Sequence, residues 1–80
     1  MTIKVIGPGC MNCETLAKRT TEALQHLNID ASIEKITDIQ KIASYGILRT
    51  PGLAVGNKVI SQGRVPTVSQ IEELLTSYVA

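Results

Sequence analysis

The sequence contains few of the residues that recognise nucleic acids. Its 80 residues include no Trp, no Phe and only two Tyr, so they offer almost no aromatic surface on which bases could stack. Eight Lys or Arg against seven Asp or Glu give a formal net charge of +1, far from the basic excess of a protein that neutralises many phosphates. We therefore expect no nucleic-acid partner.

Long apolar runs are also missing. No stretch approaches the ~20 apolar residues of a membrane span, and the six residues before Gly7-Pro8-Gly9 are too few for a signal peptide. The 44% of apolar residues is still enough for a thin core without metal or disulfide cross-links. We expect a single domain over residues 1–80 that is monomeric, cytoplasmic and not bound to membranes.

Cysteine is rare, and its spacing is informative. The two cysteines, Cys10 and Cys13, are separated by two residues. A permanent structural disulfide is not expected in a reducing compartment, so the pair indicates redox or metal chemistry. A zinc site normally needs four ligands, and the single histidine, His26, would lie far along a helix from the thiols, so we expect no zinc site.

The first two predicted elements place the cysteines. β-branched residues predict a strand over Thr2–Ile6, which a Gly-Pro-Gly segment ends. Apolar positions at spacings of three and four predict a helix from Met11 to about Asn28, which is suited to a left-handed C-cap. The two cysteines therefore lie where the first strand connects to this helix.

Alternating apolar residues predict a second strand from about Ile29 to Ile36. Thr37 and Gln40 have the spacing of a capping box, which predicts a short helix that Gly46 ends. Its expected inward residues are Ile39, Ile42 and Ala43.

Two strands and a helix complete the prediction. Gly52–Val55 and Lys58–Ser61 flank the turn pair Gly56-Asn57 and predict a β-hairpin. A second capping box, Thr67 to Gln70, opens a helix that runs to about Val79. The predicted order is β-α-β-α-β-β-α, and the first strand-helix-strand unit should place its strands in parallel.

The position of the two cysteines predicts different roles for their thiols. Free N–H groups and the positive end of the helix dipole would favour the thiolate of Cys10, lower its pKa and make it a nucleophile. Cys13, further into the helix and more covered, would be the resolving thiol that displaces the reduced product.

Five segments carry a family resemblance: Gly7-Pro8-Gly9-Cys10-Met11-Asn12-Cys13, Thr37-Asp38-Ile39, Tyr45-Gly46-Ile47, Thr50-Pro51-Gly52-Leu53 and Gly63-Arg64-Val65-Pro66. Together they resemble the small redox-active disulfide proteins, thioredoxin-like chains of bacteria and archaea, over nearly the whole sequence. The resemblance implies the thioredoxin fold in its minimal, glutaredoxin-sized form, an α/β fold with a four-stranded mixed sheet flanked by three helices. It also implies a thiol-disulfide oxidoreductase.

The resemblance also implies a substrate groove. Pro51 would be cis and keep metal away from the cysteines, Thr50 would offer its backbone to an extended substrate segment, and Gly63 would form the opposite lip. The candidate substrate-binding residues are Met11, Asn12, Thr50, Pro51, Gly63 and Arg64. The position of Arg64 in a Gly-Pro loop leaves two interpretations open, a stabiliser of the Cys10 thiolate or a solvated surface charge. Expected partners are protein disulfides and an electron donor of the thioredoxin-reductase type, with no cofactor beyond the Cys10–Cys13 disulfide itself.

The sequence departs from ordinary thioredoxin at a few positions. Met11-Asn12 stands where Gly-Pro is familiar, no Trp precedes the first cysteine, and Lys4 lies near the position of a buried aspartate.

Two alternatives remain open from the residues. A soft-metal chaperone could hold Cu(I) with the same two cysteines, but that class runs β-α-β-β-α-β and has a Met where this chain has Pro8. A redox-inactive interaction module would leave both thiols without a role.

Overall fold

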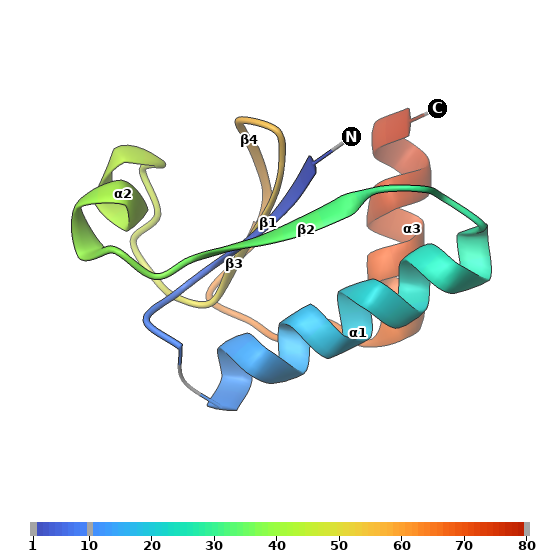
Figure 1. Cartoon of the computed structure of the whole chain (residues 1–80), viewed down its shortest axis with the longest axis horizontal. Helices are drawn as coiled ribbons and strands as arrows, with labels where there is room; N and C mark the ends of the chain where they lie inside the picture. The colour runs from blue at the N-terminus through green and yellow to red at the C-terminus, as the bar shows by residue number, and fades with distance from the viewer. Residues whose placement is uncertain (1, 10, 80) are drawn as a thin grey trace.

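The computed structural model describes residues 2–9 and 11–79, and the elements within them follow the predicted order (Figure 1). They are β1 (Thr2–Ile6), α1 (Met11–Leu27), β2 (Ser32–Ile36), α2 (Ile39–Ser44), β3 (Gly52–Val55), β4 (Lys58–Gln62) and α3 (Val68–Val79). The α/β class and the order β-α-β-α-β-β-α are confirmed. Helix α2 separates β2 from β3 and the last described element is a helix, so the order of the soft-metal chaperones is wrong for this chain.

The strands of the described residues form one mixed sheet in the order β2-β1-β3-β4. β1 and β2 run in parallel with Ile3 opposite Ile33, as predicted for a strand-helix-strand unit. β3 runs antiparallel to both β1 and β4. β2 and β4 are therefore the edges, and β1, which leads to the cysteines, is internal.

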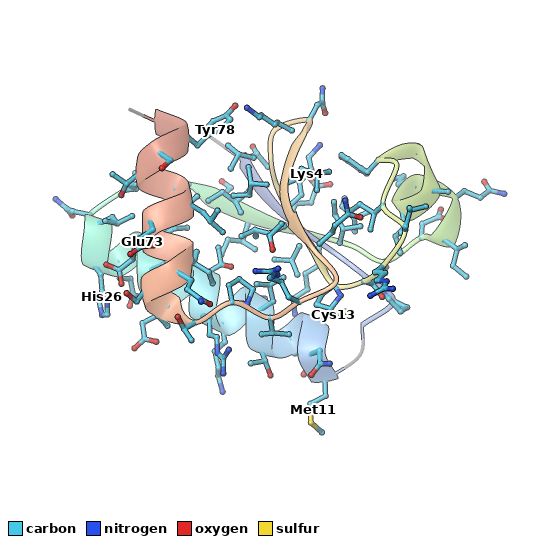
Figure 2. All side chains as sticks on the ribbon, turned by 180° about the vertical axis from the view of Figure 1, so that it is seen from behind. Lys4, Met11, Cys13, His26, Glu73 and Tyr78 are labelled. Atoms are coloured by element: carbon cyan, nitrogen blue, oxygen red, sulfur yellow. The ribbon has the colours of Figure 1, made fainter. Side chains whose placement is uncertain are left out.

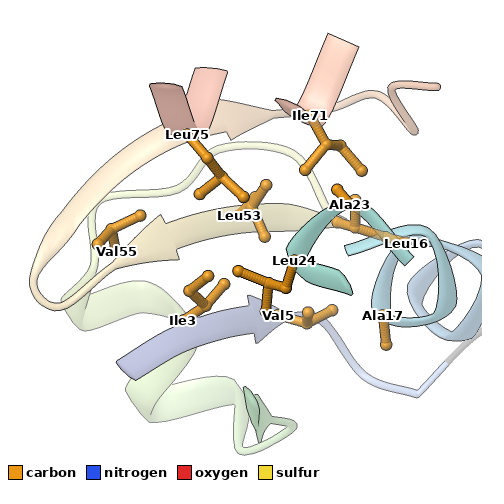
Figure 3. Close-up of a cluster of buried hydrophobic side chains, with 10 residues drawn as sticks. All are labelled: Ile3, Val5, Leu16, Ala17, Ala23, Leu24, Leu53, Val55, Ile71 and Leu75. Atoms are coloured by element: carbon orange, nitrogen blue, oxygen red, sulfur yellow. The ribbon is translucent and has the colours of Figure 1, made fainter. Parts of the chain in front are cut away.

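The two faces of the sheet carry different helices. Successive side chains of a strand point to opposite faces, so Ile3 and Val5 lie on one face and Ile6 on the other. Helices α1 and α3 cover the first face and α2 covers the second. The main core, shown in Figure 3, contains Ile3, Val5, Leu16, Ala17, Ala23, Leu24, Leu53, Val55, Ile71 and Leu75. This core fixes α1, the helix that carries Cys13, against the sheet.

Helix α1 is also tied to the segment that leads into α3. Arg19 donates hydrogen bonds from one guanidinium nitrogen to the carbonyl oxygens of Val65 (3.3 Å) and Pro66 (3.2 Å). Directly afterwards, the Thr67 hydroxyl accepts from the Gln70 N–H (3.2 Å), and the Gln70 side chain accepts from the Thr67 N–H (3.0 Å). The predicted capping box of the last helix is confirmed.

Replacing Arg19 with Met should lower the free energy of unfolding by about 1–3 kcal/mol, because two carbonyl oxygens lose a charged donor. Urea titration would measure the change. The same substitution at the exposed neighbour Lys18 is the control and should change the free energy by less than about 0.5 kcal/mol. Equal losses at the two positions would contradict the role of Arg19.

Strand β2 begins at Ser32, three residues later than predicted. Asn28 adopts the left-handed conformation with φ 56°, and its N–H donates to the carbonyl of Gln25 (3.2 Å). The next N–H, from Ile29, donates back to the carbonyl of Leu24 (3.0 Å). These two bonds form a Schellman cap, so Ile29 belongs to the end of α1 and is not available to the strand.

The start of α2 also differs from the prediction. The N-cap is Asp38 and not Thr37, because the Asp38 carboxylate accepts from the Gln40 N–H at 2.9 Å while its own backbone is extended. The predicted end of the helix is confirmed, since Gly46 has φ 73° and its N–H donates to Ala43.

Of the three residues of α2 that were expected to face inward, one is buried. Ile42 is buried, whereas Ile39 is 76% exposed and Ala43 is exposed. The helix has 6 residues, fewer than two turns, so it presents one side chain fully to the sheet. The prediction that Ile39 and Ala43 face inward is wrong.

Candidate functional site

The segment between β1 and α1 places Cys13. The Gly7 N–H donates to the carbonyl of Ile36 at 2.8 Å, which holds the end of β1 beside the end of β2. Gly9 has φ 89°, a left-handed conformation that favours glycine. Helix α1 begins at Met11, so Cys13 lies in its first turn, where it is 5% exposed.

Gly7 lies directly against the sulfur of Cys13. A β-carbon built on Gly7 would overlap Cys13 Sγ, and it would lie 3.6 Å from the β-carbon of Thr50. The absence of a side chain at Gly7 therefore makes the space that the Cys13 sulfur occupies. The same contacts bring the cysteine segment next to the segment of Thr50 and Pro51, nearly forty residues away in the sequence.

Pro51 and Gly63 form the second half of the site. The Thr50–Pro51 peptide bond is cis, which confirms the expectation from the family resemblance, and Pro51 is buried. The Gly63 N–H donates to the Pro51 carbonyl at 3.0 Å. Thr50, Pro51 and Gly63 are therefore neighbours, as the predicted groove requires.

The other predicted site residues that the structure describes are exposed. Met11 is 83% exposed and Asn12 is exposed at the start of α1, and Figure 2 shows the Met11 side chain pointing away from the body of the protein. Arg64 is exposed and lines an open groove between β4 and α3 with Gln70 and Glu73. Cys10 lies outside the described residues, so the predicted contact between it and Arg64 stays a prediction.

A comparison with protein families identifies the family of this chain. The family model for a thioredoxin domain matches residues 1–76. The chain belongs to the thioredoxin domain family.

Two relatives support the same assignment. The chain is 40% identical over 76 residues to a thioredoxin of Methanothermobacter thermautotrophicus, which covers 95% of this chain and 99% of the relative. It is 36% identical over 78 residues to a thioredoxin of Methanocaldococcus jannaschii, covering 98% of this chain and 90% of the relative. This thioredoxin-family chain accordingly has a redox function of the thioredoxin type, as a thiol-disulfide oxidoreductase.

Two residues that contact the predicted site of this thioredoxin-family chain were missed by sequence reasoning: Gly7 and Arg49. Gly7 was interpreted as part of a strand stop, although it forms the wall of the Cys13 pocket. Arg49 is exposed, contacts Gly63 and directly precedes Thr50.

Lys4 lies on the face of β1 that α2 covers, and its side chain contacts Tyr45 at the end of α2. Its amine donates a hydrogen bond to the Tyr45 hydroxyl at 2.6 Å and lies 5.2 Å from the centre of the Tyr45 ring. This hydrogen bond, helped by the charge of Glu34, raises the pKa of Lys4 above its ordinary value. The contact with Tyr45 therefore favours the charged form of Lys4.

Metal-ligating side chains are dispersed over the described part of this thioredoxin-family chain. Within residues 2–9 and 11–79, no three His, Cys, Asp or Glu side chains are grouped as ligands for a metal ion. His26 is exposed near the far end of α1 from Cys13 (Figure 2), and its ring lies 3.3 Å from the Glu72 carboxylate of α3. His26 therefore lies on the surface of α1, far along the helix from Cys13 as predicted. In the same residues, no helix combines the length and apolar character that a membrane crossing requires.

Proposed function

We propose that this chain reduces or exchanges protein disulfides through Cys10 and Cys13, with a mixed disulfide as intermediate. The observation that carries the proposal is the position of the Cys13 sulfur, which lies against Gly7 in the first turn of α1 and beside Thr50. Cys10 directly precedes the first residue of α1 in the sequence. We expect the N–H groups and the dipole of that helix to favour its thiolate.

The reaction has two exchange steps. The Cys10 thiolate attacks one sulfur of the target disulfide, the target S–S bond breaks, a Cys10–target disulfide forms, and the released target thiolate takes up a proton. Cys13 then loses its proton and attacks the Cys10 sulfur, the mixed disulfide breaks, and the second target thiolate leaves and is protonated. Two electrons and two protons pass to the target, and the Cys10–Cys13 disulfide remains. No cofactor beyond this disulfide takes part.

The groove would hold the target as an added strand. The backbone of Thr50 makes no hydrogen bond within residues 2–9 and 11–79, so its N–H and carbonyl are available to an extended segment. Pro51 and Gly63, joined by their backbone hydrogen bond, would form the floor and opposite lip. Met11 would add a soft apolar surface for partners, with Asn12 beside it.

The proposed reaction also requires an electron donor. After each turnover the oxidised pair needs a two-electron donor, for which we propose a dithiol or flavin reductase of the thioredoxin-reductase type. This cycle requires a reducing compartment such as the cytoplasm, and it needs no nucleic acid, membrane or second copy of the chain.

A Cys13→Ser variant tests the proposed roles of the two sulfurs. It should accumulate a mixed disulfide between Cys10 and a peptide disulfide, because attack proceeds while release of the product is blocked. Mass spectrometry of the non-reduced adduct would measure it.

Cys10→Ser is the matched control and should form no adduct, since the attacking thiol is absent. Adducts on Cys13 in that variant, or none in either variant, would refute the proposed order of attack. Tight Cu(I) binding by the wild type without any disulfide reduction would favour the chaperone alternative.

A further inference from the structure

The segment before Thr50 meets the loop after β4 through a contact between Arg49 and Gly63. A β-carbon built on Gly63 would lie 3.1, 3.3 and 3.7 Å from the β-, δ- and γ-carbons of Arg49. Gly63 also has φ 73°, which favours glycine. The aliphatic part of Arg49 therefore rests on the bare backbone of Gly63, at the lip of the proposed groove.

Among the described residues, the charge of Arg49 has no partner. Arg49 is exposed, and no residue of 2–9 or 11–79 accepts a hydrogen bond from it or forms an ion pair with it. Arg64, which follows Gly63 in the sequence, is likewise exposed and without an ion pair among these residues. We call the three residues Arg49, Gly63 and Arg64 the cationic lip.

Arg49 and Arg64 both adjoin Gly63, and their like charges repel in the isolated protein, although Arg64 also lines the groove between β4 and α3 with Glu73. Such an arrangement is favourable when an anionic partner occupies the adjacent groove, because complementary charge raises the rate of encounter and fixes orientation. Arg49 directly precedes Thr50, and a strand residue advances only about 3.3 Å, so a target side chain one or two residues from the Thr50 pairing would lie within its reach.

We propose that Arg49, supported by Arg64, is a specificity-determining residue that selects disulfides whose flanking residues are Asp or Glu. This inference rests on the proposed disulfide reduction and adds the charge of the preferred target. The substrate class is a protein segment with a carboxylate within about two residues of the attacked cysteine.

The test compares two self-quenched fluorescent peptide disulfides that differ only in carrying Glu or Lys beside the cysteine. The pre-reduced full chain, in excess, reduces each peptide in a single turnover, and the second-order rate constant is measured at low and at physiological ionic strength. The wild type should prefer the Glu peptide, and the preference should fall as salt screens exposed charges.

Arg49→Gln should reduce the rate constant for the Glu peptide by about 2- to 5-fold, the factor that corresponds to an exposed ion pair, and leave an otherwise identical neutral peptide unchanged. Arg49→Lys should restore the preference, and Arg49→Glu should invert it. Lys58→Gln removes the same charge at the other end of the hairpin, in register with Val55, and is the matched control that should keep the wild-type preference.

The outcomes separate the two proposals. Reduction of both peptides at equal rates, or a preference that Arg49→Gln leaves intact, would overturn the role of Arg49 while disulfide reduction stands. An equal loss in the Arg49→Gln and Lys58→Gln variants would show an effect of net charge and overturn the role as well. No reduction of any peptide by the wild type would refute the proposed function, and the inference with it.

Discussion

Replacing Gly7 with Ala should slow disulfide reduction by about 100-fold, because a sulfur displaced by roughly 1 Å from its working position loses about that factor in rate. A methyl group at Gly7 would overlap Cys13 Sγ, and Cys13 is buried, so the sulfur has to turn away from its place. Under the proposed mechanism Cys13 performs the second exchange. The variant should therefore accumulate the Cys10 mixed disulfide, which rapid acid quenching and mass spectrometry would detect.

A second glycine variant separates this steric effect from a backbone effect. Gly56, in the turn between β3 and β4, has φ 60° and no atom within 4 Å of a built β-carbon. Gly56→Ala should cost about 1–2 kcal/mol of stability through its left-handed backbone and should not accumulate the adduct. A normal rate in Gly7→Ala, or equal adduct in both variants, would contradict the assigned role of Gly7.

Local sequence signals were sufficient to predict most of the elements. Each signal lies within a few residues: the spacing of Leu16, Thr20 and Leu24 along α1, the β-branched run of β1, and the capping box from Thr67 to Gln70. For the same reason the cysteines could be assigned to the start of a helix. The structure places Cys13 there and agrees with the prediction that it is covered.

Local signals fail where two bonding options compete over one or two residues. Thr37 and Asp38 are both good N-caps, and the carboxylate of Asp38 caps α2. Ile29 fits the alternation of a strand, yet its N–H completes the cap of α1. These outcomes depend on hydrogen bonds that the pattern of apolar residues does not encode.

Only part of the site could be predicted from the sequence, because it is built from segments that lie far apart in the sequence. Thr50, Pro51 and Gly63 entered through the family resemblance and are neighbours in the structure. The contact of Gly63 with Arg49 joins two such segments, and the contact of Gly7 with Cys13, within one segment, depends on the side chain that Gly7 lacks. No spacing rule within one segment specifies such contacts, so the specificity proposed for Arg49 needed the three-dimensional structure.

Leu53→Ala should have the largest effect on stability, lowering the free energy of unfolding by about 2–5 kcal/mol through lost burial and a residual cavity. Leu53 is fully buried on the internal strand β3, and Figure 3 shows it in the middle of the main core. A chain of 80 residues has a total stability of roughly 4–12 kcal/mol, so this one change removes a large part of it.

Leu48→Ala is the matched control, since it deletes the same atoms from a side chain that is 92% exposed. It should change the free energy of unfolding by less than about 0.5 kcal/mol. Urea titration with an unchanged slope would show that both variants unfold from the same native state. Equal losses for the two variants would mean that Leu53 does not lie in the core, and the packing that holds α1 and Cys13 against the sheet would then be wrong.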